Sequence, residues 1–210
     1  FAAQFGMSAV YGAKVGLSLP QISAFVATFY VGATLLQYPL GWVSDRMDRR
    51  TLIMLVAAGG GVGSLVGMIL GGNYTMLLVA AFVIGGLANP LYSMLIAYTN
   101  DYLQHDDMAA ASGGLVFING LGAIAGPVIT GWLMGEGVFG PPGFFLVMAV
   151  LLFSLAGYAA WRATQRPSAP IQDSGLMTPM APSSTAYAVE YAQEVAIEAD
   201  LEGQDDAEAR

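Results

Sequence analysis

The chain has 210 residues, of which 56% are hydrophobic and 10% are charged, and its mean hydropathy is +0.61. Such a composition excludes an ordinary soluble domain and predicts an all-α polytopic membrane protein. The sequence contains no cysteine, which excludes disulfides and thiolate metal sites, and its formal net charge is −8.

The negative charge belongs to one end of the chain. Residues 1–166 carry six basic and six acidic side chains, whereas residues 167–210 carry nine carboxylates against Arg210. The stretch 166–210 also contains four prolines and interspersed serines, which favour a disordered linker. We expect an acidic, disordered tail, which is either solvated without a fixed role or acts as a docking element.

Apolar stretches long enough to cross the hydrocarbon core, which takes about 20 helical residues, can be counted along the chain. We expect one partial and five complete spans, over residues of about 1–12, 20–43, 51–70, 75–99, 109–134 and 143–161. The second begins with the spacing of a capping box, since Gln21 lies three places after Ser18. Because the first apolar stretch has no charged lead-in, we interpret the chain as a fragment that starts inside a span.

A charged loop, Gly41 to Arg50, interrupts the apolar sequence between the second and third predicted spans. It holds three of the seven basic residues of the chain. Lysine and arginine favour the cytoplasmic side of short loops. If this loop is cytoplasmic, Arg162 and Arg166 lie inside as well, and only Lys14 lies outside. We therefore expect the charged loop and the C-terminal tail in the cytoplasm.

Groups that carry catalysis or hold metals are scarce in the sequence. It contains no nucleophile and base in a plausible context and no phosphate-binding loop, so we expect neither an enzyme nor a cofactor nor nucleic-acid binding. The nearest approach to a metal cluster is a group in the polar loop 100–108, which we interpret as a solvated connector: Asp101, His105, Asp106 and Asp107. No ionisable side chain lies deep within a span, so a proton-coupling residue is expected outside this chain.

Prolines lie within three of the predicted spans. Pro39, Pro90 and Pro127 each remove a backbone hydrogen bond and free a carbonyl group one turn earlier. In lipid, such carbonyl groups must be satisfied by neighbours or face a cavity, so we expect kinked helices packed in a bundle. Glycines at four-residue spacing, including Gly59 and Gly63, predict close contacts between helices.

Polar side chains inside the spans are candidates to line a central cavity. An unpaired amide in hydrocarbon costs several kcal/mol, so we expect Gln37, Asn89 and Asn119 to point inward. Hydrogen bonds between helices would satisfy these amides equally well. Tyr30 and Tyr92 are further candidates to line the cavity.

The charged loop resembles a signature of a known family. Its spacing Gly-x-x-x-Asp-Arg-x-x-Arg-Arg is similar to the loop signature of major facilitator superfamily transporters, through Gly41, Asp45, Arg46, Arg49 and Arg50. Asp48 stands where that signature usually has a glycine, so the geometry of the turn is expected to differ. The Gly122-x-x-x-Gly126-Pro127 pattern resembles pore-lining helices of the superfamily. With residues 90–101, it is most similar to the bacterial YcaD-like branch.

This resemblance implies a fold and a function. The superfamily has two six-helix halves, and six spans with both ends inside fit the C-terminal half with its first helix truncated. The implied protein is a secondary active transporter of the bacterial inner membrane. It would move a small-molecule substrate by alternating access, with the lipid bilayer and the missing N-terminal half as its partners.

The charged loop is expected to act as a conformational latch. In this role Asp45 accepts hydrogen bonds from neighbouring arginines and from a helix N-terminus of the opposite half. The alternative is a non-transporting membrane sensor or assembly subunit that works through its cytoplasmic tail.

Overall fold

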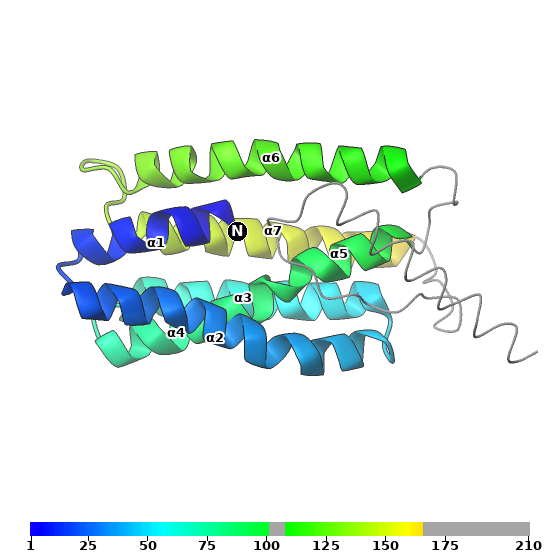
Figure 1. The fold of residues 1–210 in the computed structure, drawn as a ribbon, viewed down its shortest axis with the longest axis horizontal. Helices are drawn as coiled ribbons and strands as arrows, with labels where there is room; N and C mark the ends of the chain where they lie inside the picture. The colour runs from blue at the N-terminus through cyan, green and yellow to red at the C-terminus, as the bar shows by residue number, and fades with distance from the viewer. Residues whose placement is uncertain (101–107, 166–210) are drawn as a thin grey trace, which may run out of the picture.

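A computed structural model describes residues 1–100 and 108–165, and all regular structure within them is helical (Figure 1). The helices are α1 (Ala2–Lys14), α2 (Leu19–Ser44), α3 (Arg49–Leu70), α4 (Tyr74–Ala88), α5 (Pro90–Asn100), α6 (Met108–Leu133) and α7 (Gly143–Gln165). The polar group predicted at Asp101 to Asp107 and the tail 166–210 lie outside the described residues.

Five helical stretches in this part of the chain are long and apolar enough to cross a membrane: Leu19–Ser44, Arg49–Leu70, Tyr74–Thr99, Gly113–Leu133 and Gly143–Gln165. The third of them contains both α4 and α5. α1 has 13 residues, which at about 1.5 Å per residue span roughly 20 Å, less than the hydrocarbon core of about 30 Å. The predicted all-α polytopic membrane fold is therefore confirmed.

Helix α1 packs against α2, α6 and α7, while α4 packs against both α2 and α3, and α3 runs along α7. The turns α1–α2, α3–α4 and α6–α7 lie together at one end of the bundle, which we call the far end (Figure 1). The charged loop between α2 and α3 lies at the opposite end. The charged loop carries three arginines, whereas Lys14 and Glu136 are the charged residues of the α1–α2 and α6–α7 connections at the far end.

Local sequence explains where α2 begins. The backbone N–H of Ser18 donates to Oε1 of Gln21 at 2.9 Å, so the predicted capping box is present. Pro20 at the start of this helix lacks only a hydrogen bond that the first turn does not need.

An aromatic cluster holds the far end together. The ring of Tyr11 lies 5.1 Å from the rings of Phe144 and Phe145, and 5.7 Å from that of Phe25, measured between centroids. All four side chains are at most 3% exposed. Because aromatic rings bury large apolar areas, these contacts fix α1 and α2 against α7.

Glycines bring α2 and α4 into close contact. A Cβ atom on Gly32 would overlap the carbonyl oxygen of Phe82, and one on Gly85 would overlap that of Phe29. The two backbones thus touch at this crossing. The predicted close contacts of Gly59 and Gly63 are also found: a Cβ atom at either position would lie 2.8 Å from a side-chain carbon of α4.

Candidate functional site

The charged loop is a tight connection whose ends are capped. Asp45 is the C-cap of α2, and Asp48 is the N-cap of α3. The Asp48 carboxylate accepts hydrogen bonds from the backbone N–H of Thr51 at 3.3 Å and from its hydroxyl at 2.8 Å. A side-chain acceptor at an N-cap satisfies an N–H group that has no partner within the helix. The aspartate that departs from the loop signature therefore starts the next helix.

Arg50 is buried, with 5% of its surface exposed, and joins three helices. Its guanidinium group donates to the carbonyl oxygen of Arg162 on α7 and to the hydroxyl of Tyr98 on α5, each at 3.2 Å. The carbonyl groups at the end of α7 lack partners within the helix and carry partial negative charge. Arg50 thus stabilises the arrangement of α3, α5 and α7 at the charged end.

The two other arginines of the loop have different surroundings. Arg49 is 4% exposed, and its Nη2 lies 3.9 Å from Oδ1 of Asp45. Arg46 is exposed and folds back on Trp42, donating to its carbonyl oxygen at 3.0 Å with the guanidinium carbon 4.1 Å from the ring centroid. Gly41 lies one turn before Asp45 in α2. Asp45 and Arg46 are therefore the charged residues of the signature that remain at the surface.

A helix break separates α4 from α5 at Asn89, next to Pro90. The side-chain Nδ2 of Asn89, which is 8% exposed, donates to the carbonyl oxygen of Gly85 at 2.8 Å. The same carbonyl also accepts the backbone N–H of Asn89 at 3.3 Å, so the amide adds a second hydrogen bond within its own helix beside the break. By contrast, α2 and α6 continue through Pro39 and Pro127 as single helices, and kinks there stay a prediction.

Two of the predicted cavity residues contact one face of α1. Phe1 and Phe5 are one helical turn apart and share that face. Tyr30 of α2 stacks on Phe5 with 4.7 Å between ring centroids, and Tyr92 of α5 meets Phe1 edge-on at 6.0 Å. We call these four side chains the aromatic face. Tyr30 is 54% exposed, whereas Tyr92 is 8% exposed.

The other two candidates lie on the helices that flank α1. Gln37 on α2 and Asn119 on α6 are both partly buried. These helices pack on either side of α1 (Figure 1). The three amides thus lie on three different helices, α2, α4–α5 and α6, and their place in one cavity stays a prediction.

Sequence reasoning missed the partners of the charged loop. Tyr98 and the Arg162 carbonyl come from distant parts of the chain, and no spacing in the sequence points to them. The capping role of Asp48 could have been recognised, because aspartate is a preferred N-cap residue and an apolar helical stretch follows closely after it.

Comparisons with known proteins agree with this architecture. The chain matches the family model "Major Facilitator Superfamily" over residues 1–193. It is 28% identical over 132 residues to the uncharacterized MFS-type transporter YfkF of Bacillus subtilis. The aligned region covers 61% of this chain and 33% of YfkF.

Two further relatives show the same pattern of partial coverage. An uncharacterized MFS-type transporter of Yersinia pestis is 26% identical over 130 residues, covering 62% of this chain and 33% of that protein. A triacylglyceride transporter of Mycolicibacterium smegmatis is 32% identical over 119 residues, and this alignment covers 55% of this chain and 21% of that protein. The chain therefore spans about a third or less of the length of these relatives.

The family match covers most of the chain, including the charged loop and all the described helices. The protein is a multi-pass membrane protein, and the chain belongs to the major facilitator superfamily.

Proposed function

We propose that this chain is the C-terminal half of a secondary active transporter that moves a small molecule across the bacterial inner membrane by alternating access. The observation that carries the proposal is the superfamily match over residues 1–193. The transporter names of the relatives support the same role, and their greater length supports a second half outside this chain.

The exposure of the helices indicates where a second half would pack. Within the most apolar stretch of each span, 72% of the residues of α4 and α5 are buried inside the bundle, compared with 17% in α2 and 6% in α6. The open faces of α2 and α6 carry large apolar side chains, including Leu35, Tyr38, Ile124 and Val128. A partner half that packs on these two helices would enclose α1 and its aromatic face.

In the enclosed arrangement, the aromatic face and the three amides Gln37, Asn89 and Asn119 form the wall of the transport cavity. The break at Pro90 gives this wall a place to bend during rocking, because a carbonyl group there lacks its helical donor. A place in the YcaD-like branch is part of the proposal and rests on residues 90–101 and 120–131.

The substrate class that these residues favour is an apolar or amphiphilic molecule. The aromatic face offers rings for apolar contact. The donor group of Asn89 is already used within its own helix, which weakens the case for a polar nutrient. Relatives named triacylglyceride transporters, one from Mycobacteroides abscessus at 29% identity over 129 residues, favour the same class.

The charged loop provides the latch of this mechanism. Arg50 secures the loop to its own half, and Asp45 stays at the surface where the opposite half can reach it. A surface ion pair contributes only about 0–1 kcal/mol, so the latch requires that the opposite half cover Asp45 in one state. The sensor alternative depends on the tail, and the names of the relatives favour transport over it.

Transport by the full-length protein in reconstituted vesicles tests the proposal. Radiolabelled triacylglycerol and a radiolabelled sugar serve as the apolar and polar probes. We expect saturable movement of the apolar probe, which Tyr30→Ala reduces because a ring of the cavity wall is lost. Tyr158→Ala, at an exposed tyrosine of α7, is the matched control and should leave the rate unchanged. A folded protein that moves neither probe would contradict transport of an amphiphile.

A further inference from the structure

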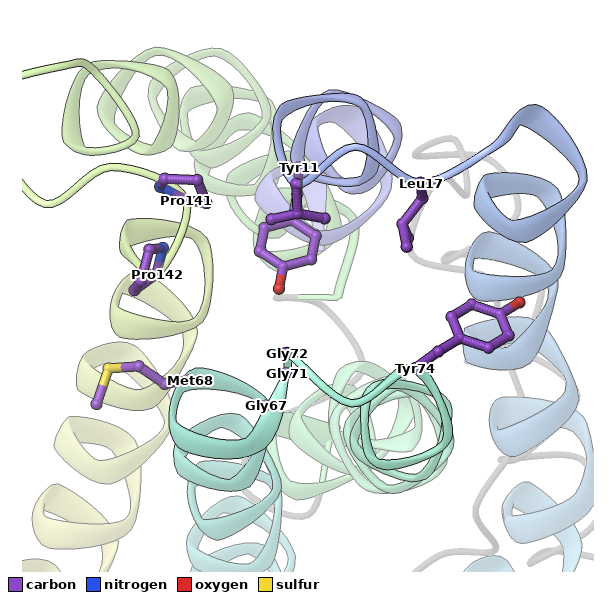
Figure 2. A pocket seen from close by; sticks show the side chains of 10 residues that line it. Tyr11, Leu17, Gly67, Met68, Gly71, Gly72, Tyr74, Pro141 and Pro142 are labelled. Carbon is purple, nitrogen blue, oxygen red and sulfur yellow. The ribbon is translucent and has the colours of Figure 1, made fainter.

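A pocket of about 310 Å³ lies at the far end of the bundle, opposite the charged loop (Figure 2). Its walls come from the end of α1, the end of α3 with the following Gly71-Gly72 turn, Tyr74 at the start of α4, and the prolines before α7. Leu17 enters it from the α1–α2 turn (Figure 2).

One hydroxyl group in the pocket has no partner. Tyr11 is 3% exposed, and its ring is held by Phe25, Phe144 and Phe145. Figure 2 shows its hydroxyl pointing toward the Gly71-Gly72 turn. A Cβ atom on Gly71 would lie 3.0 Å from that oxygen, so the glycine leaves the hydroxyl accessible. It has no hydrogen-bond partner among the described residues.

The remaining polar side chain of the pocket is already paired. The hydroxyl of Tyr74 donates to the carbonyl oxygen of Gln21 at 3.3 Å, which ties the start of α4 to α2. The rest of the lining consists of valine, leucine, methionine, proline and glycine, and none of the described lining residues is charged. Among the described side chains that line the pocket, the Tyr11 hydroxyl is therefore the one polar group without a hydrogen-bond partner, and the side chains other than the two tyrosines are apolar.

These features determine which ligands fit. A charged molecule would lose its hydration without gaining a partner, which is unfavourable. A wholly apolar molecule would leave the Tyr11 hydroxyl unpaired, at a cost of about 1–3 kcal/mol. The volume is near the lower end of small-molecule sites, which hold about 300–1,000 Å³.

We propose that the far-end pocket binds a neutral amphiphile, a compact apolar body with one hydroxyl or carbonyl oxygen that forms a hydrogen bond with Tyr11. This chemistry is shared by the ester region of a bilayer lipid and by a free alcohol or ester. The site is separate from the aromatic face, and binding there does not depend on whether the protein transports anything.

Photolabelling of the full-length protein in detergent tests this site. The probe is 3-azioctanol, a neutral photoreactive alcohol, and its adducts are mapped by mass spectrometry. We expect saturable labelling of the peptides that contain Tyr11, Met68 and Tyr74, with displacement by 1-octanol. Binding here is measured directly, so a negative result leaves the transport proposal standing.

Three variants locate the ligand. Tyr11→Phe keeps the ring contacts and removes only the hydroxyl, so the half-saturating concentration should rise about three- to tenfold. Tyr158→Phe removes an exposed hydroxyl near the other end of α7 and should change nothing. Leu17→Trp places a larger side chain in the pocket from the α1–α2 turn and should abolish saturable labelling.

Added phosphatidylcholine separates the two sources of ligand. Loss of labelling identifies a bilayer lipid as the occupant, whereas labelling that persists and yields to 1-octanol identifies a free amphiphile. Labelling that does not saturate would overturn the proposal, since the pocket would then hold only water. Undiminished saturable labelling of a folded Leu17→Trp protein, or an unchanged half-saturating concentration in Tyr11→Phe, would overturn it as well.

Discussion

Asp48 and Arg50 are two side chains of the charged loop that stabilise different parts of the structure. Asp48 accepts two hydrogen bonds from Thr51 at the start of α3, and Arg50 donates to α5 and α7. One interaction is local and the other joins distant helices. Substitutions at the two positions should therefore have effects of different size.

Replacing Asp48 tests the cap. Asp48→Ala removes the acceptor and should lower the free energy of unfolding by about 1 kcal/mol, whereas Asp48→Gly should cost only a few tenths of a kcal/mol. Asp48→Asn keeps an acceptor oxygen and is the control. Thermal unfolding of the full-length protein in detergent measures the relative stabilities of the three variants. Equal stability of the alanine and asparagine variants would argue against a capping role.

Replacing Arg50 tests the contact between three helices. Lysine cannot reproduce the forked geometry of guanidinium, so Arg50→Lys loses at least one of the two partly buried hydrogen bonds to Arg162 and Tyr98. We expect a loss of about 1–3 kcal/mol in the free energy of unfolding. Arg46→Lys is the matched control, because Arg46 is exposed and its contacts with Trp42 contribute at most about 1 kcal/mol. Similar losses for both variants would contradict this assignment.

At the scale of elements, α4 touches α2 through backbone contact at their crossing and ends at Ala88, before α5 begins at Pro90. Gly32 and Gly85 let the two backbones meet, and the side chain of Asn89 donates to the carbonyl oxygen of Gly85 in the turn before the break. The same span thus combines a close backbone crossing with a break between two helices.

The crossing makes Gly85 sensitive to a single methyl group. Gly85→Ala forces α2 and α4 apart, and overpacking of this kind costs about 1–3 kcal/mol. Gly157→Ala, where nothing lies within 4 Å of the added carbon, should be neutral or stabilising by up to about 1 kcal/mol. Thermal unfolding of the two variants gives the comparison. A neutral Gly85→Ala would show that the helices do not touch there.

At the scale of the whole molecule, the two ends of the bundle should face opposite sides of the membrane. The exposed residues Met47 in the charged loop and Glu136 in the α6–α7 turn mark these ends. Gly137 next to it has a φ of 86°, which a cysteine would adopt only with strain, so Glu136 is the better site for a reporter.

Cysteine labelling of the full-length protein, with no other cysteine present, tests the orientation. A membrane-impermeant maleimide should label Glu136→Cys in intact cells, but Met47→Cys only after the membrane is opened. The physical reason is the excess of arginine at the charged end, which favours the cytoplasm. Labelling of both variants in intact cells would contradict this topology.

The same reporters test the latch. Asp45→Asn removes the charge that the opposite half would contact, so the closed state of the cytoplasmic side should become less populated. We expect Met47→Cys to react severalfold faster in opened membranes when Asp45→Asn is also present. The protein should remain folded, because Asp45 is partly exposed. Unchanged reaction rates on both sides would count against a latch.

Local spacing in the sequence was enough to predict much of this protein. Apolar length predicts the membrane class and the helical fold, the Ser18 to Gln21 spacing predicts the start of α2, and the charged loop indicates the superfamily. These signals depend on contacts within a few residues or on composition, both of which are visible along the chain.

Only the tertiary structure decided which side chains meet. That Arg50 is buried against Tyr98 and Arg162, that Tyr30 and Tyr92 share one face of α1, and that Tyr11 opens onto a pocket all depend on how the helices are rotated and crossed. In a soluble helix, an apolar stripe would reveal the inward face. These spans are apolar on nearly every side because lipid replaces water, so the sequence specifies that they cross the membrane while packing selects the faces that touch.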